Sequence, residues 1–265
     1  MLKKLLVLIA FFILPVAELE ASKLDKVLAG EHRTKSSTRD GSRHPKATLE
    51  FFQVSSDQKV LEITPGGGWY TEILAPYMRD SGLLAVGQYD ANNPSNYYKR
   101  SINKFNKKMA ANPELYDQVE VATFHVPGVY QLGEDGRFDR VVTFRNLHNW
   151  MRNGDEEMKK IFAAFYKALK PGGKLGVLDH RLPEDRAKNG KGGYVKQSYA
   201  ISIAESVGFK LEASSEINAN AKDTADHEKG VWTLPPSYKL GDKDRAKYEA
   251  IGESDRMTLL FVKPE

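Results

Sequence analysis

One stretch of sequence decides the fold: Val60-Leu61-Glu62-Ile63-Thr64-Pro65-Gly66-Gly67-Gly68-Trp69-Tyr70-Thr71-Glu72-Ile73-Leu74. An apolar, β-branched run ends next to an acidic residue, three glycines follow, and apolar residues then recur at helical spacing. This order predicts a strand, a tight turn and a helix. At such a junction in a parallel α/β sheet, glycine lets a nucleotide-like ligand approach the backbone closely.

The pattern of apolar residues in the rest of the chain predicts alternating strands and helices. The expected strands cover residues 59–63, 83–89, 118–124, 138–144, 174–178, 209–217 and 257–262. The expected helices cover residues 47–54, 69–78, 92–111, 155–170 and 195–207. Alternation of this kind predicts an α/β fold with a doubly wound, mainly parallel seven-stranded sheet.

Length and composition limit the function classes that the chain can belong to. The chain has 265 residues, 41% of them hydrophobic, and no cysteine. This length can bury a core of good size. A net charge of +4, with both signs mixed along the chain, argues against a dedicated nucleic-acid binder. The lack of cysteine excludes disulfides, thiolate metal ligands and cysteine nucleophiles.

The beginning of the chain has the order of a secretory signal peptide. Lys3 and Lys4 precede the apolar run 5–17, and the small residue Ala21 follows. The run is shorter than the roughly 20 apolar residues that span a bilayer. We therefore expect a signal peptide over residues 1–21, and a periplasmic or secreted mature protein without stable membrane insertion. An uncleaved N-terminal anchor is the alternative.

We expect residues 22–265 to form a single domain with two irregular parts. Residues 31–46 form a basic leader, which is either a solvated flap or a segment that closes over a ligand. Residues 218–255 are polar, and in this topology they connect the last two strands at the ligand-binding edge. An insert at this place is expected to be a lid or substrate wall, with a poorly ordered loop as the alternative.

Carboxylates flank the glycine turn on both sides. Glu62 precedes it, and Asp90 follows the second expected strand, where a carboxylate can accept two hydrogen bonds from a ribose diol. A capping role is the alternative for Asp90. The third glycine of a dinucleotide-binding fingerprint is missing, because Thr71 stands in its place. Glu62 would also repel a pyrophosphate, so the turn suits a cationic or zwitterionic ligand better.

Three segments carry a family resemblance: residues 61–68, 138–148 and 169–175. They resemble the first motif, the fourth-strand motif and the turn before strand five of the class I S-adenosylmethionine-dependent methyltransferases. The leader stretch 39–45 and the run Asp179-His180-Arg181 resemble a bacterial group of predicted methyltransferases that are often exported. The resemblance spans residues 49–262 and implies a Rossmann-like methyltransferase fold.

The resemblance also implies S-adenosylmethionine as the cofactor. The residues expected to contact it are Glu62, Thr64, Gly66, Gly67, Gly68, Tyr70, Asp90 and Asn146. Two positions depart from the family pattern. Thr64 stands where the first glycine is common, and the third expected strand ends in Phe124-His125-Val126-Pro127, where many relatives present an acid to the adenine.

The methyl acceptor is expected near the ends of the fourth and fifth strands. His148 and His180 follow these strands and are the candidate catalytic bases, because imidazole titrates near neutral pH. A structural histidine is the alternative for His148. Arg181 is the candidate for orienting an anionic substrate, with a surface ion pair as its alternative. Trp232 and Tyr238 are the candidate aromatic contacts from the insert, and no metal is expected.

These features together predict a methyltransferase that acts on a small molecule. The reaction would be an in-line displacement at the methyl carbon, which requires alignment of the reacting atoms above all. Two alternatives remain open: an exported, non-catalytic ligand-binding protein on the same fold, and an aminopropyltransferase-like enzyme. Neither the acceptor nor the oligomeric state follows from the sequence.

Overall fold

The structure is a computed structural model that describes residues 16–186 and 192–265. Residues 1–15 of the expected signal peptide lie outside the described part. The expected cleavage position, Ala21, lies within helix α1 (Val16–Leu28). Glu20 of this helix accepts hydrogen bonds from Ser56 and Tyr77, which cleavage near Ala21 would remove. Within residues 16–186 and 192–265, no helix is long and apolar enough to cross a membrane.

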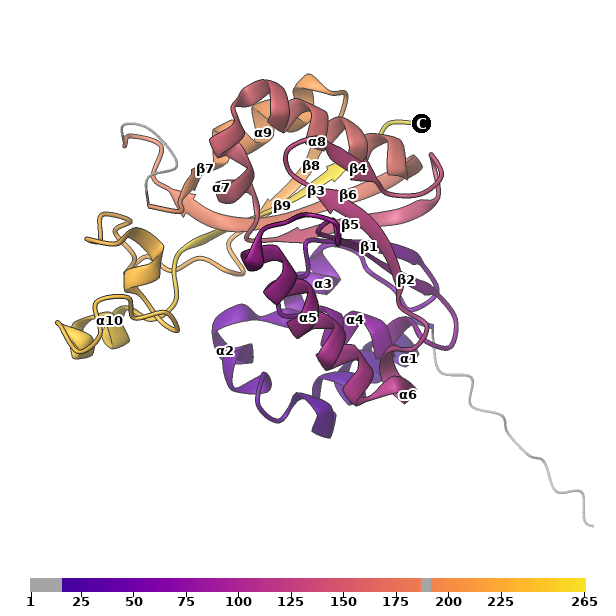
Figure 1. Ribbon diagram of the computed structural model, residues 1–265, viewed down its shortest axis with the longest axis horizontal. Helices are drawn as coiled ribbons and strands as arrows, with labels where there is room; N and C mark the ends of the chain where they lie inside the picture. Colours follow the sequence, from indigo (N-terminus) through magenta and orange to yellow (C-terminus); the bar gives the residue numbers. More distant parts are fainter. Residues whose placement is uncertain (1–15, 187–191) are drawn as a thin grey trace, which may run out of the picture.

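A large, mainly parallel sheet forms the middle of the molecule (Figure 1). The described strands are β1 (Lys59–Ile63), β2 (Leu83–Gln88), β3 (Glu120–His125), β4 (Val129–Gln131), β5 (Phe138–Phe144), β6 (Leu169–Leu182), β7 (Val195–Lys196), β8 (Lys210–Ser215) and β9 (Arg256–Val262). Their order is β4-β3-β2-β1-β5-β6-β9-β8, and β7 pairs with β6. β9 runs antiparallel to both β6 and β8. The predicted doubly wound α/β fold is confirmed, with the short strands β4 and β7 added to the seven expected ones.

Helices cover both faces of the sheet, as Figure 1 shows for α8 and α9 on one side and α3, α4 and α5 on the other. Besides α1, the described α-helices are α2 (Asp40–Arg43), α3 (Pro45–Phe51), α4 (Thr71–Met78), α5 (Asn96–Ala111), α6 (Pro113–Tyr116), α7 (Leu147–Trp150), α8 (Asp155–Ala168), α9 (Gln197–Ser206) and α10 (Arg245–Ile251). Short 3-10 turns lie at Glu31–Arg33, Ser37–Arg39, Met151–Asn153 and Gly230–Thr233. Each helix of the expected set is present, with ends shifted by a few residues.

The strand pattern explains why two layers of helices are needed. Leu61 and Ile63 of β1 pack in the core under α8 and α9, whereas Val60 packs in the core under α3 and α4. Successive side chains of a strand point to opposite faces, so an apolar strand in a parallel sheet must be covered on both. All three side chains are fully buried.

The leader is folded against α4 and is not a solvated flap. Arg33, which is fully buried, makes two hydrogen bonds of 2.7 and 2.9 Å to the carboxylate of Asp40. The Trp69 indole donates to the backbone oxygen of Ser36 at 3.1 Å. These contacts place the leader beside the glycine turn.

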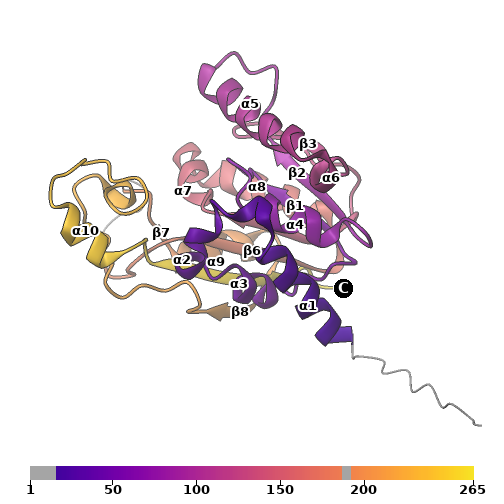
Figure 2. The same ribbon diagram turned by 90° about the horizontal axis from the view of Figure 1, so that it is seen from below.

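The insert 218–255 is also folded, and Figures 1 and 2 both show its helix α10 projecting beyond β7. The buried carboxylate of Asp223 holds it together. This group accepts hydrogen bonds from the Tyr194 hydroxyl and from the backbone of Asp255, and it pairs with the His227 ring at 2.8 Å. The alternative of a poorly ordered loop therefore does not describe this segment.

Close packing at β6 gives a test of the fold. An added Cβ at Gly176 would lie 2.6 Å from the ring of the fully buried Phe52. We expect Gly176→Ala to lower the free energy of unfolding by about 1–3 kcal/mol through overpacking. Urea denaturation measures this change. Gly41→Ala on α2, where the new Cβ meets nothing within 4 Å, is the matched control. Equal stability of the two variants would contradict the packing described.

Candidate active site

The carboxyl ends of β1, β2, β5 and β6 meet at one edge of the sheet, the place where ligands bind in open α/β folds. Two cavities lie there. The central cavity, of about 490 Å³, borders the glycine turn, the leader and the insert. The aromatic cavity, of about 710 Å³, borders the ends of β2, β3 and β5. The residues common to both walls are Tyr89, Tyr97, Asn146, His148, Asn149 and Trp232.

The glycine turn is open toward the central cavity. Thr64 and Gly66 have positive φ angles of 51° and 59°, and an added Cβ at Gly66 would meet nothing within 4 Å. Thr64, Gly66 and Gly67 line the cavity. Gly68 instead packs against Phe105 of α5, 3.3 Å from where its Cβ would lie. The structure therefore brings three of the four predicted turn residues to the cavity.

Glu62 and Tyr70 lie behind the turn, and neither lines the central or the aromatic cavity. Glu62 is buried, accepts a 2.6 Å hydrogen bond from the Thr71 hydroxyl, and has its pKa raised to about 7 by burial. Tyr70 is also buried and stacks on Phe144, with ring centroids 3.5 Å apart. Its ring therefore packs in the core and does not reach the cavity where a cofactor contact was predicted, whereas Trp69 lines that cavity.

Asp90 lies beside the cavity walls. Its carboxylate accepts a 2.8 Å hydrogen bond from the backbone of Asn92, which closes a turn. Tyr89 lines both cavities and packs against Tyr98, with ring centroids 4.7 Å apart. The sequence interpretation missed Tyr89, although an aromatic residue directly before the strand-end acid is a usable signal. The ribose role of Asp90 stays a prediction.

Asn146 joins the ends of two strands. Its amide nitrogen donates to the backbone oxygens of Ile63 and Thr64, at 3.0 and 3.3 Å, and to the Thr143 hydroxyl at 3.0 Å. These bonds fix the end of β1 against the end of β5. Asn146 lines both cavities, so it positions the glycine turn at the cavity wall.

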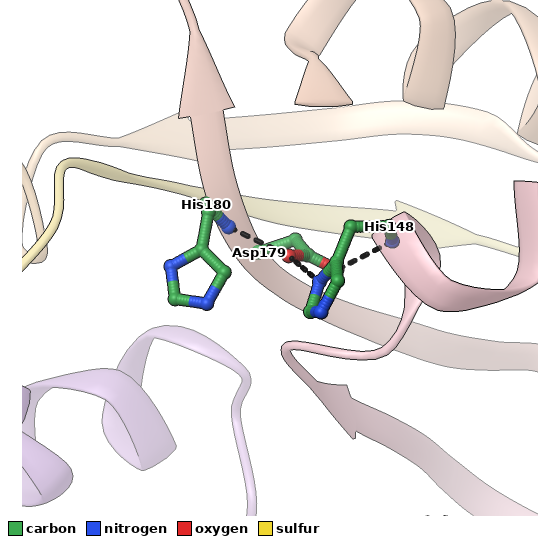
Figure 3. A group of neighbouring side chains, drawn as sticks. All are labelled: His148, Asp179 and His180. Carbon is green, nitrogen blue, oxygen red and sulfur yellow. Dashed lines mark hydrogen bonds and ion pairs between the residues drawn. The ribbon is translucent and has the colours of Figure 1, made fainter. Parts of the chain in front are cut away.

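His148, Asp179 and His180 lie together, as Figure 3 shows. Asp179 is fully buried, and its carboxylate lies 2.9 Å from Nδ1 of His148 and accepts the backbone N–H of His180 at 2.7 Å. The two rings lie 5.2 Å apart between centroids. Nδ1 of His180 lies 2.5 Å from the Ser254 hydroxyl. Burial, followed by the neighbouring His148 and arginines, holds the pKa of His180 well below its usual value.

This arrangement suits general-base chemistry at His148. When Nδ1–H of the ring donates to Asp179, the lone pair of Nε2 is left to accept a proton, and the carboxylate stabilises the imidazolium that forms. His148 lines both cavities. His180, kept neutral by burial, is the less suitable base of the two predicted ones.

The same three residues could also hold a metal ion by geometry, since their ligand atoms lie within 4.8 Å of one another. The spacing in sequence gave no sign of this group, because the fold brings together residues from two strand ends. The surrounding charge opposes a cation. Arg256, Arg145 and Arg43 each lower the pKa of His180 by repulsion, and a divalent cation would experience the same repulsion more strongly. We therefore favour the proton-transfer role.

Arg181 does not line either cavity, and its predicted substrate contact is corrected to a structural ion pair. Its guanidinium makes hydrogen bonds of 2.7–3.0 Å to Glu216 and Asp255, which raise its pKa. Tyr238 is likewise outside both cavity walls, because Arg245 stacks on its ring at 3.5 Å. Trp232 lines both cavities, with its ring 6.2 Å from that of His148, and its contact with a substrate stays a prediction.

Comparison with protein-family models and with curated proteins finds no significant match. Solved structures do match. A SAM-dependent methyltransferase from Aquifex aeolicus is 15% identical with a TM-score of 0.57, over 92% of this chain and 98% of that one. The [4+2]-cyclase SpnF is also 15% identical, with a TM-score of 0.58 over 94% and 95% of the two chains.

A third match is geranyl diphosphate C-methyltransferase from Streptomyces coelicolor A3(2), in complex with Mg²⁺, geranyl diphosphate and S-adenosyl-L-homocysteine. It is 11% identical with a TM-score of 0.56, over 90% of this chain and 83% of that one. At these identities the likeness concerns the fold. The chain therefore has the Rossmann-like fold of the S-adenosylmethionine-dependent methyltransferases, on which the cyclase is also built.

The buried carboxyl of Glu62 makes stability depend on pH. Its pKa is about 7 in the folded protein against 4.5 for the free group, so the folded state binds more protons between these values. Stability is therefore expected to fall as pH rises from about 4.5 to 7. Glu62→Gln, which retains an acceptor for Thr71, removes this loss. Between pH 5 and pH 8, the variant should gain about 2–3 kcal/mol relative to the wild type in urea denaturation. A constant difference between the two proteins would contradict a raised pKa.

Proposed function

We propose that this protein transfers a methyl group from S-adenosylmethionine to a small-molecule acceptor. The observation that carries the proposal is the shared cavity wall: the open glycine turn and the carboxylate-bound His148 border the same space. The fold likeness to S-adenosylmethionine-dependent methyltransferases supports it. A non-catalytic binding protein would have no need of a buried carboxylate that orients an imidazole at the cavity wall.

The residues present fit the cofactor. Thr64, Gly66 and Gly67 would hold its methionine part, since the turn is open and the Thr64 hydroxyl, buried at the wall, has no hydrogen-bond partner among the described residues. The aromatic cavity, lined by Tyr89 and Tyr98, offers ring faces to the adenine. When bound, the cofactor supplies a methyl group activated by positive sulfur.

The chain's own residues would align the acceptor and take its proton. The acceptor's nucleophilic atom would take the methyl group, and the sulfur of the cofactor would keep the electron pair of the carbon–sulfur bond. The acceptor's proton, where it carries one, passes to Nε2 of His148, and Asp179 stabilises the resulting charge. Trp232, contributed by the insert, covers the cavity wall next to His148 and helps to exclude water.

Export and the small-molecule nature of the acceptor belong to the same proposal. Export is supported by the charge and apolar pattern of residues 1–21 in the sequence. N-terminal sequencing of the protein from fractionated cells tests it. The central cavity, of about 490 Å³ and bounded by the leader and the insert, has the size of a small-molecule site, which favours a small acceptor over a polymer.

Cofactor binding is the first test. Isothermal titration of the full chain with S-adenosylmethionine and S-adenosylhomocysteine should give saturable binding. Tyr89→Ala should weaken it about tenfold through loss of stacking. Tyr238→Ala, an aromatic residue outside both cavity walls, is the matched control and should bind as the wild type does. Absence of binding at millimolar cofactor would refute the proposal, whereas unchanged binding by Asp90→Ala would refute only the ribose role of Asp90.

The base is tested separately from cofactor binding. His148→Gln should keep affinity for S-adenosylhomocysteine but lose about a hundredfold or more in methyl transfer, measured as S-adenosylhomocysteine released with a panel of acceptors. Asp179→Asn should show a smaller loss and a shifted pH profile, because the imidazole loses its counter-charge. His227→Gln breaks the other buried histidine–aspartate pair, that with Asp223, and is the control. Full transfer by His148→Gln would contradict the assignment.

A further inference from the structure

Arginine side chains from distant parts of the sequence converge on the central cavity. We call Arg39, Arg43, Arg145 and Arg256 the arginine cluster, and all of them line this cavity together with His180. The leader supplies two of them, the end of β5 one and the start of β9 one. The proposed reaction step assigns no role to them.

The arginine cluster has more positive charge than its neighbours balance. Glu253 is the carboxylate that lies among the guanidinium groups: it accepts a 2.7 Å hydrogen bond from Arg39, pairs with Arg256, and lies 3.7 Å from Arg43. Arg145 makes no ion pair with any residue of the described part of the chain. Four cations therefore share one carboxylate.

The imbalance is costly because two members of the cluster are shielded from water. Arg43 and Arg256 are 4% and 2% exposed. Burial and the neighbouring guanidinium groups lower the pKa of Arg43 to about 8 and that of Arg145 to about 10. Within residues 16–186 and 192–265, Nη1 of Arg43 and Nε of Arg256 have no hydrogen-bond acceptor. Buried charges of one sign are stable only when paired, and Glu253 alone does not supply enough negative charge for the cluster.

The backbone at Arg145 supports a functional reason for this cost. Its φ angle is +65°, in the left-handed region that side chains rarely adopt. Residues held in this region cluster at ligand sites, where the strain persists because surrounding structure fixes it. Here the adjoining residue Asn146 is fixed by three hydrogen bonds. The strained residue thus presents a charge at the cavity wall.

We propose that the arginine cluster binds an anionic group of the methyl acceptor, a carboxylate or a phosphate. This inference rests on the proposed function. Guanidinium groups bind both anions through paired N–H donors, and such charge-assisted bonds are stronger than neutral ones. His180 lines the cavity beside the cluster, and its ring lies 5.2 Å from that of His148. An anion held there would anchor the acceptor next to the base.

The carboxylate of the cofactor is the competing occupant, and charge counting argues that it does not suffice. Glu253 and one further carboxylate still leave two of the four cations unbalanced. A sulfonium ion near this excess would be repelled. An anionic acceptor reduces the repulsion, so it should strengthen binding of the positively charged cofactor more than binding of the neutral-sulfur product.

The experiment measures anion binding without a cofactor. The full chain is titrated with inorganic phosphate and, separately, with acetate, at constant ionic strength set with sodium chloride. Binding is followed by calorimetry and by the melting temperature. We expect saturable binding of one anion at least, with the stronger of the two identifying phosphate or carboxylate as the acceptor's group. Arg145→Gln should weaken it about tenfold, and Arg145→Lys, which keeps the charge but not the paired N–H donors, should weaken it less.

Two further variants sharpen the test. Glu253→Gln removes the competing carboxylate, so it should bind the anion more tightly than the wild type does. Arg137→Gln is the matched control: this arginine pairs with Glu120 outside the central cavity, and its loss should leave anion affinity unchanged. Melting temperatures of all variants show whether they are folded.

The outcomes separate this inference from the proposed function. Two outcomes would overturn this inference but not the proposed function. One is cofactor binding without saturable anion binding, and the other is an anion affinity of Arg145→Gln equal to that of the wild type. Displacement of the anion by one equivalent of S-adenosylhomocysteine would assign the cluster to the cofactor and also overturn it. Anion binding by a chain that binds neither cofactor form would overturn the acceptor role together with the proposed function. We expect the wild type to bind the anion and S-adenosylhomocysteine at the same time. We expect Arg145→Gln to lose affinity for the anion only.

Discussion

The buried carboxylate of Asp179 is the contact on which the geometry of the site depends. It accepts the backbone N–H of His180 on its own strand and pairs with the ring of His148 from the neighbouring strand end. A fully buried anion must be satisfied by hydrogen bonds, and these two neighbours supply them. The hydrogen bond that the Asp179 carboxylate requires therefore also fixes the orientation of the His148 ring. Asn146 plays the matching role for the glycine turn, so both halves of the cavity wall are fixed by polar groups at the ends of β5 and β6.

Charge distribution gives the site its second constraint. Burial, followed by His148 and the nearby guanidinium groups, lowers the pKa of His180, and the same guanidinium groups oppose a metal ion at a donor set that geometry alone would allow. The same groups favour an anion. An acceptor with negative charge would offset part of this excess, which the cofactor would not do, because its sulfonium and ammonium groups outnumber its one carboxylate. The fold likeness leaves this question open, because the matched structures include a cyclase and a methyltransferase bound to a diphosphate substrate.

Local patterns predicted the fold and named several of the residues that line the two cavities. The strand, glycine turn and helix at residues 60–74 follow from the periodicity of the apolar residues. The topology of a parallel sheet also brings the strand ends near His148 and His180 to the same edge of the sheet. Side-chain partners could not be predicted in this way. Arg181 forms hydrogen bonds with Glu216 and Asp255, and the guanidinium of Arg245 stacks on the ring of Tyr238. Neither Arg181 nor Tyr238 therefore reaches the central or the aromatic cavity. Short strands such as β4 carry too few residues for a periodic signal.

The arginine cluster shows most clearly what a single sequence hides. Arg39 binds Glu253 across 214 positions of sequence, and Arg256 donates to the backbone of Ser42 across the same separation. These bonds join the leader to the last strand and its preceding loop. The leader is therefore a wall of the cavity, with Arg43 packed on Trp69 at 4.5 Å. Because binding of an anion here would relieve repulsion between segments from both ends of the chain, occupancy of the site and closure of the fold around it are expected to be thermodynamically linked.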